Sequence, residues 1–148
     1  DPMLGRWEKT KPAGVDFKRV PAVFTTDWSL LAQAFYTAET LGVGAKMHEP
    51  LFEAIHIDRL NLSDEQVLAE LFLEHAGVDT ADFTQAFSSF SVKSRVSQAN
   101  AKGRAYGITG VPTMVVNGKY RVDGRMAGSN EDMLKVVDFL VAKEQAAL

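Results

Sequence analysis

Few side chains in this sequence have an obvious capacity for chemistry, and one reactive type is missing. The 148 residues include no cysteine, so they offer neither a thiol nucleophile nor a thiolate ligand for zinc. The three histidines, His48, His56 and His75, form no H-E-x-x-H frame, and spacing alone matches no serine to a histidine and an acid. We therefore assign no catalytic residue, no metal site and no cofactor from the sequence.

The most informative spacing lies in residues 107–122, GITGVPTMVVNGKYRV. Pro112 opens an apolar run typical of a buried strand, where proline is tolerated only at the first residue, an edge or a bulge. Asn117 and Gly118 form the pair favoured in two-residue type I′ hairpin turns. The stretch therefore predicts a loop, a strand, a tight turn and a second strand.

The peptide bond between Val111 and Pro112 has two geometries with different consequences. A trans bond merely begins the strand, and it is the usual state of X–Pro bonds. A cis bond would turn the backbone of Val111 outward, with its N–H and C=O free to pair with an extended peptide. Residues 110–113, Gly-Val-Pro-Thr before a strand and a hairpin, resemble the cis-proline loop of thioredoxin-fold proteins, and this resemblance favours the cis form.

Other segments narrow the resemblance. Residues 50–55 (PLFEAI), 90–94 (FSVKS) and 116–122 (VNGKYRV) together resemble the DsbA family of periplasmic thiol:disulfide interchange proteins. The similarity runs collinearly through nearly all 148 residues. It implies an α/β fold in which a thioredoxin-like sheet carries a large all-helical insertion.

The resemblance also implies domain limits. We expect residues 1–25 and 107–148 to form an incomplete thioredoxin-like domain, and residues 26–106 to form the helical insertion. The family carries a Cys-x-x-Cys pair at the start of its first long helix, whereas residues 1–4 resemble the part just downstream of that pair. We therefore expect the chain to begin after the catalytic motif, without the N-terminal strand and the start of the active-site helix.

In the DsbA family a cysteine of low pKa at a helix N-terminus forms a mixed disulfide with a substrate and passes its disulfide on. The resemblance implies a fragment of an oxidoreductase that introduces disulfides into exported proteins, redox-inactive as given because it has no cysteine. The implied partners are unfolded or extended polypeptides and, for the intact family, a membrane reoxidase. The implied location is the periplasm, although no signal peptide is visible in this sequence.

Carried over residue by residue, the resemblance also gives candidate site residues. The implied substrate contacts are Val111, Pro112, Thr113, Arg125 and Met126. Arg19 falls where the family places a basic residue beneath the active-site helix, in partnership with a buried acid that is absent here. The alternative for Arg19 is a solvated strand charge, because charged side chains are mostly exposed.

Two other functions stay open at this point. A group of glutathione-dependent isomerases and transferases uses the same scaffold with a Val-Pro loop and without Cys-x-x-Cys, and the residues upstream of Asp1 would separate it from the oxidoreductases. A redox-inactive peptide-binding module is the second alternative, which a full-length gene without cysteine codons would favour.

Composition argues against two classes of partner. The net charge of −3 comes without any basic block, which argues against nucleic-acid binding. No apolar run approaches the ~20 residues that a membrane-spanning helix needs. A charged fraction of 24% and a hydrophobic fraction of 46% are typical of a globular chain.

Periodicity predicts the elements that position these motifs. Residues 3–10 indicate a helix, residues 15–24 a strand whose regular part ends near Val20, and residues 26–106 five helices. The expected helix N-caps are Thr26 with Asp27, Ser63 in a capping box, Asp79 with Thr80, and Ser129. The C-terminal helix is expected to bury Met133, Val136, Val137, Leu140 and Val141.

The resemblance leaves a gap in the sheet. In thioredoxin-like folds the strand before Cys-x-x-Cys lies between the strands expected here at 15–20 and 113–116. Without it, buried unpaired backbone groups would cost roughly 1–3 kcal/mol each. We expect these two strands to close together, a strand to be borrowed from a second copy by swapping or edge pairing, or the missing part of a longer protein to fill the gap.

Overall fold

The computed structural model describes residues 2–148, which divide into two compact units. One unit contains the residues up to Arg19 together with Tyr106–Leu148, and the other contains Val20–Ala105. The domain limits expected from the sequence stay a prediction.

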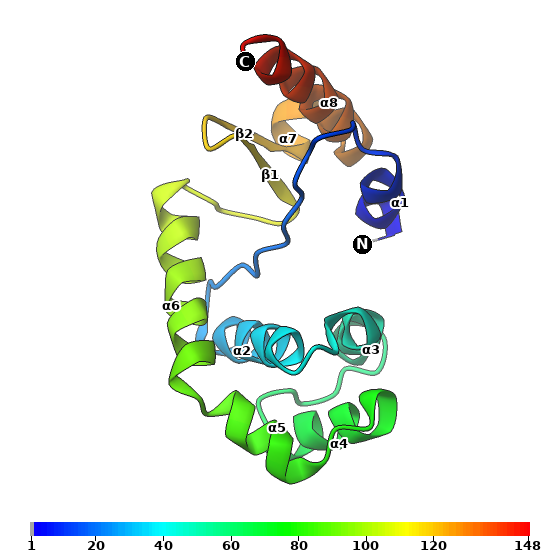
Figure 1. The fold of residues 1–148 in the computed structure, drawn as a ribbon, viewed down its shortest axis with the longest axis vertical. Coiled ribbons are helices and arrows are strands. Elements are labelled where there is room, and N and C mark those ends of the chain that lie inside the picture. The colour runs from blue at the N-terminus through cyan, green and yellow to red at the C-terminus, as the bar shows by residue number, and fades with distance from the viewer. Residues whose placement is uncertain (1) are drawn as a thin grey trace. The chain divides into compact units, whose positions relative to one another are not determined.

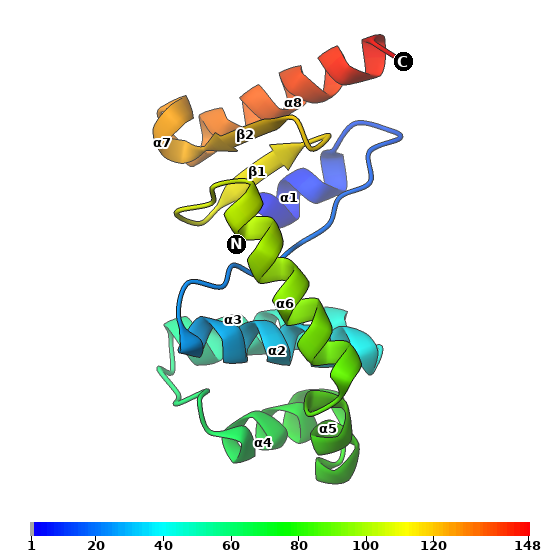
Figure 2. The same cartoon turned by 90° about the vertical axis from the view of Figure 1, so that its left-hand side faces the viewer.

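A two-stranded antiparallel hairpin and a long helix form the centre of the first unit. Its elements are α1 (Pro2–Thr10), β1 (Thr113–Val116), β2 (Tyr120–Asp123), α7 (Gly124–Ala127) and α8 (Asn130–Ala146). α8 lies alongside the hairpin in both views of the fold (Figure 1, Figure 2). Their shared apolar core contains Trp7, Met114, Val116, Val122, Met133, Leu134, Val137, Leu140 and Val141.

Trp7 anchors α1, the predicted first helix, in the core of this unit. Its indole is buried, and Nε1 donates a hydrogen bond of 2.8 Å to Asp138 Oδ1 on α8. Phe17 meets the indole edge-on, with ring centroids 5.3 Å apart. A buried tryptophan needs an acceptor for its N–H, and Asp138 supplies one while the rest of the ring stays in apolar surroundings.

The hairpin confirms the predicted strand, turn and strand, with one correction to the turn. Asn117 and Gly118 have φ of 52° and 67°, the positive values that a type I′ turn requires at both positions. However, the register places Val116 opposite Tyr120, so the connection contains three residues rather than two. The extra residue is Lys119, whose N–H donates to Val116 O at 3.0 Å.

The C-terminal end of α8 holds two distant loops. Glu144 Oε2 accepts hydrogen bonds from Asn117 Nδ2 and from Lys119 Nζ, both at 2.7 Å, at the tip of the hairpin. The next residue, Gln145, donates through Nε2 to Ala13 O at 2.8 Å. The last turns of α8 therefore fix both the hairpin tip and the loop that follows α1.

The strand expected at residues 15–20 is wrong. Within residues 2–148 only β1 and β2 form a ladder, and they pair with each other. A strand exists through its inter-strand hydrogen bonds, and the described residues provide no partner for this segment. Val15 and Phe17 still pack against the core of the first unit, so their apolar character reflects burial. The expected closure of this segment onto β1 is therefore not observed.

The C-terminal helix begins as predicted, but its buried face differs in two residues. Ser129 Oγ accepts the N–H of Asp132 at 3.0 Å and caps α8. Val136, which was expected to be buried, is 37% exposed, whereas Leu134, which was not, is buried. The short helix α7, which the sequence pattern did not predict, also packs against α8. The residues that α8 buries thus depend on two neighbouring elements, the hairpin and α7. Four expected residues are buried: Met133, Val137, Leu140 and Val141.

Five helices form the second unit, as predicted. They are α2 (Thr26–Thr40), α3 (Gly44–His56), α4 (Glu65–Ala76), α5 (Thr80–Phe87) and α6 (Phe90–Ala105). Phe83 is fully buried, and its ring centroid lies 4.8 Å from that of Phe72 and 5.1 Å from that of Phe87. These three rings therefore belong to the core, whereas Phe90 at the start of α6 is 86% exposed.

The helix caps of the second unit are predicted to within one residue. Asp79 caps α5 as expected. Thr25 caps α2 one residue before the expected Thr26, and Asp64 caps α4 one residue after the expected Ser63. Serine, threonine and aspartate all cap well, so a pair of such residues does not reveal which of the two will be used.

Candidate functional site

The loop before β1 presents free backbone groups. The peptide bond between Val111 and Pro112 is cis, as the motif predicted. The side chain of Val111 is 57% exposed, and neither its N–H nor its C=O makes a hydrogen bond within residues 2–148. Thr113 Oγ1 donates a hydrogen bond of 2.6 Å to Gly110 O. This bond joins the residues that flank Val111 and Pro112. Strand pairing with an extended peptide could satisfy both free groups of Val111.

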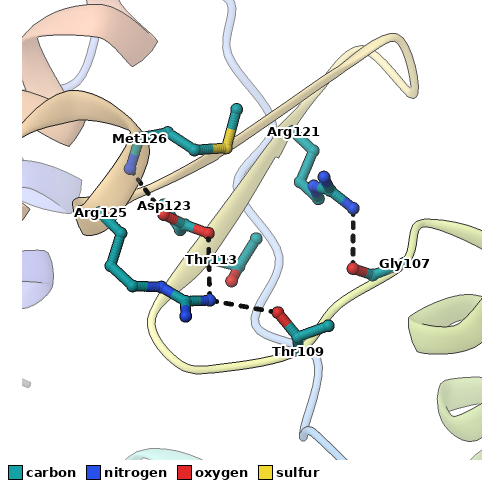
Figure 3. A pocket seen from close by; sticks show the side chains of 7 residues that line it. All are labelled: Gly107, Thr109, Thr113, Arg121, Asp123, Arg125 and Met126. Atoms are coloured by element: carbon teal, nitrogen blue, oxygen red, sulfur yellow. Dashed lines mark hydrogen bonds and ion pairs between the residues drawn. The ribbon is translucent and has the colours of Figure 1, made fainter.

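An open pocket of about 410 Å³ lies beside this loop (Figure 3). Alternation along the hairpin puts Thr113, Arg121 and Asp123 on the face opposite the buried Met114 and Val122. The preceding loop and α7 supply the other walls. The complete lining is Gly107, Thr109, Thr113, Arg121, Asp123, Arg125 and Met126.

The structure brings Arg125 and Met126 to this pocket, together with Thr113. Arg125 Nη2 donates to Thr109 Oγ1 at 3.3 Å and lies 3.9 Å from Asp123 Oδ2, and its side chain is 80% exposed. Met126 is 61% exposed, and its N–H donates to Asp123 Oδ1 at 2.9 Å. Asp123 thus caps α7 with one carboxylate oxygen and faces Arg125 with the other. Val111 and Pro112 do not line the pocket, although they stand between Thr109 and Thr113 in the chain.

Sequence reasoning missed Arg121, which supplies the second positive charge of the pocket. Arg121 Nη1 donates to Gly107 O at 2.7 Å and to Tyr106 O at 3.0 Å, so the guanidinium is anchored on the loop (Figure 3). In the observed register, with three residues between the strands, Arg121 and Asp123 share a face with Thr113. The expected two-residue turn would have placed them on the opposite face, so the sequence pattern did not identify Arg121. The contribution of Thr109 comes from the path of the loop, which no local pattern reports.

Arg19 pairs with an acidic residue of α1. Its Nη1 contacts Glu8 Oε2 of α1 at 2.5 Å, and its guanidinium carbon lies 5.1 Å from the centre of the Phe17 ring. The side chain is 30% exposed, so it is neither a fully solvated charge nor paired with a deeply buried acid. Arg19 does not line the pocket, and its role beneath an active-site helix stays a prediction.

Two further observations concern the described residues as a whole. Within residues 2–148 no three histidine or acidic side chains gather as a metal-binding group would. In the same residues no helix combines the length and the apolar character needed to cross a membrane.

Comparison with known proteins places this chain in a family. A family model described as a DSBA-like thioredoxin domain matches residues 4–139. The chain belongs to this DsbA-like family. The thiol:disulfide interchange protein DsbA of Pseudomonas aeruginosa is 42% identical over 147 residues, which cover 99% of this chain and 69% of that protein. The DsbA-like thioredoxin fold with a helical insertion is therefore confirmed, as is membership of a thiol:disulfide oxidoreductase family.

Solved DsbA structures share the fold. A crystal structure of a Pseudomonas aeruginosa DsbA variant superposes with a TM-score of 0.91 at 41% identity and covers 98% of this chain and 78% of that one. DsbA of Proteus mirabilis, solved as a Cys-to-Ser variant with the non-covalently bound peptide PWATCDS, has a TM-score of 0.74 at 28% identity. That comparison covers 94% of this chain and 77% of the Proteus protein.

Proposed function

We propose that this chain supplies the polypeptide-binding side of a DsbA-like thiol:disulfide oxidoreductase acting on exported proteins in the periplasm. The observation that carries the proposal is the backbone of Val111, whose N–H and C=O are unpaired within residues 2–148 beside an exposed side chain. Main-chain pairing gives affinity for extended polypeptides of many sequences. Val111, Pro112 and Thr113 form the pairing loop, and Arg125 and Met126 border the adjoining pocket.

The Proteus relative supports this assignment because it was solved with a short peptide bound non-covalently. Binding without a covalent bond is what a backbone-pairing loop provides. Disulfide transfer itself needs a thiolate that attacks one sulfur and a thiolate that leaves from the other. This sequence has no cysteine, so we propose that the 148-residue chain binds polypeptides without exchanging disulfides. In the intact oxidoreductase a membrane reoxidase would restore the disulfide.

The binding proposal can be tested with backbone-modified peptides. The probe is a fluorescent analogue of PWATCDS in which serine replaces cysteine, with each amide N-methylated in turn. We expect methylation of the residue that pairs with Val111 to weaken binding roughly two- to tenfold, the value of one hydrogen bond, with little effect elsewhere. The measurement is fluorescence polarisation with the 148-residue chain.

The matched control is the Val111→Ala variant, which keeps both backbone groups and should show the same methylation profile. Equal binding of every methylated analogue would show that Val111 does not pair with the peptide. In a separate assay, the chain verified cysteine-free by mass should leave insulin reduction by dithiothreitol at the buffer rate. Turnover above that rate would exclude the thiol mechanism for this chain and favour the glutathione-dependent alternative.

A further inference from the structure

We infer that the pocket beside the Val111 loop binds an acidic side chain of the polypeptide, and that Arg125 determines this preference. The inference rests on the proposed polypeptide-binding function and adds a substrate class to it. Its basis is the charge of the pocket lining, which contains two arginines and one aspartate. A carboxylate entering this space would meet a net positive environment.

The two guanidinium groups differ in how firmly they are held. Arg121 donates to two backbone carbonyl oxygens, at 2.7 and 3.0 Å, so its charge is fixed in place. Arg125 makes one long hydrogen bond of 3.3 Å to Thr109 and is 80% exposed. A guanidinium carries five N–H donors in a planar fork that suits a carboxylate. Most of the donors of Arg125 are therefore available to a ligand.

Asp123 neutralises Arg125 only weakly. Their closest atoms, Nη2 and Oδ2, are 3.9 Å apart, which is beyond hydrogen-bond distance. The other oxygen, Oδ1, is occupied by the N–H of Met126 at the start of α7. A ligand carboxylate can thus form shorter, charge-assisted hydrogen bonds to Arg125 than Asp123 does.

The pocket lies within reach of a peptide paired at Val111. Thr109 precedes Val111 by two residues and Thr113 follows it by two, and both line the pocket. Two residues of extended chain span at most about 7 Å. Alternate side chains of an extended peptide point to the same face. One side chain at or next to the pairing position can therefore enter the pocket while the backbone stays paired.

The experiment compares peptides that differ only in charge. Extended peptides carry aspartate or asparagine at one position, which is moved along the sequence, and binding to the 148-residue chain is measured by fluorescence polarisation at low and high salt. At one position we expect the acid to bind about two- to fivefold more tightly than the amide, the scale of a solvent-exposed ion pair. High salt should reduce the difference because it screens exposed charges.

Three variants assign the preference to the pocket. Arg125→Gln should remove it, and Arg125→Glu should favour a lysine peptide over the acid. Asp123→Asn keeps a side chain that can cap α7 but loses the competing carboxylate, so it should increase the preference. Arg104→Gln removes an equal charge from an exposed site at the end of α6 and should leave the preference unchanged.

The outcomes separate the inference from the proposed function. Equal binding of acid and amide peptides at every position would overturn the inference while leaving the proposed function intact. An acid preference that survives in Arg125→Gln, with circular dichroism showing a folded protein, would also overturn it. Failure of all peptides to bind, charged or neutral, would refute the proposed function itself and the inference with it.

Discussion

Among single residues, Gly107 allows the loop between α6 and β1 to turn. Gly107 has φ of +64°, in the left-handed region that residues with a Cβ rarely adopt. Its carbonyl oxygen accepts the hydrogen bond from Arg121 Nη1. A Cβ added to this glycine would lie 2.6 Å from the same nitrogen. Position 107 therefore favours glycine for two reasons: its positive φ, and the lack of room for a Cβ beside Arg121.

We expect Gly107→Ala to destabilise the protein by more than the backbone term alone, which is about 1–2 kcal/mol for a left-handed residue. The excess comes from displacement of Arg121, and peptide binding should weaken in parallel. The matched control is Gly77→Ala, where φ is +66° and an added Cβ meets no described atom within 4 Å. Urea unfolding measures both variants. Equal losses in the two variants would show that the contact between Arg121 and Gly107 carries no energy.

Among the elements, the tip of the hairpin is joined to the C-terminal end of α8 by a polar contact. Glu144 accepts hydrogen bonds from Lys119 and Asn117, which lower the pKa of its carboxyl from the usual 4.5. The same hydrogen bond and the charge of Glu144 raise the pKa of Lys119 from 10.5. A carboxyl whose pKa is lowered by folding stabilises the protein above its unfolded pKa, and a lysine whose pKa is raised does so below its own.

The stability difference between the wild type and Glu144→Gln should therefore be largest between about pH 4.5 and 10.5. It should shrink as the pH falls through the lowered pKa of Glu144, because the protonated carboxyl no longer attracts Lys119. Thermal unfolding from pH 2 to pH 7 measures the effect. Glu53→Gln, at an exposed site on α3, serves as the charge-matched control. A difference that stays constant with pH would show that the charge of Glu144 contributes nothing.

For the molecule as a whole, the edges of β1 bear on how the chain assembles. Within residues 2–148 this strand pairs only with β2, which leaves its second edge without a described partner. Unpaired strand edges are templates for pairing with another chain. Of the expected ways to fill the gap beside β1, we propose that the chain self-associates through this edge.

Light scattering across a range of concentrations should therefore show a mass that rises above the monomer value of 16.2 kDa. Val115→Lys, in the middle of β1, should reduce the association because a charged residue discourages edge pairing. The same variant should melt as cooperatively as the wild type. A stable, cooperatively melting monomer at every concentration would contradict the proposal.

Local chemistry in the sequence determined much of this structure. The caps at Asp79 and Ser129 and the positive φ values at Asn117 and Gly118 depend on a few neighbouring atoms, which the sequence specifies directly. The family and the cis bond before Pro112 followed from a motif of four residues and its collinear context. The five helices of the second unit followed from apolar periodicity, because each helix closes its own hydrogen bonds.

Only the tertiary structure decided the features that depend on distant partners. Residues 15–20 have the composition of a strand, but a strand needs a second segment beside it, and the described residues provide none. Arg19 forms its ion pair with Glu8 of α1, and Leu134 is buried in the core that α8 shares with the hairpin. The pocket joins Thr109 to Arg125 across the hairpin. Such contacts arise between segments that the chain brings together only on folding, so no local pattern encodes them.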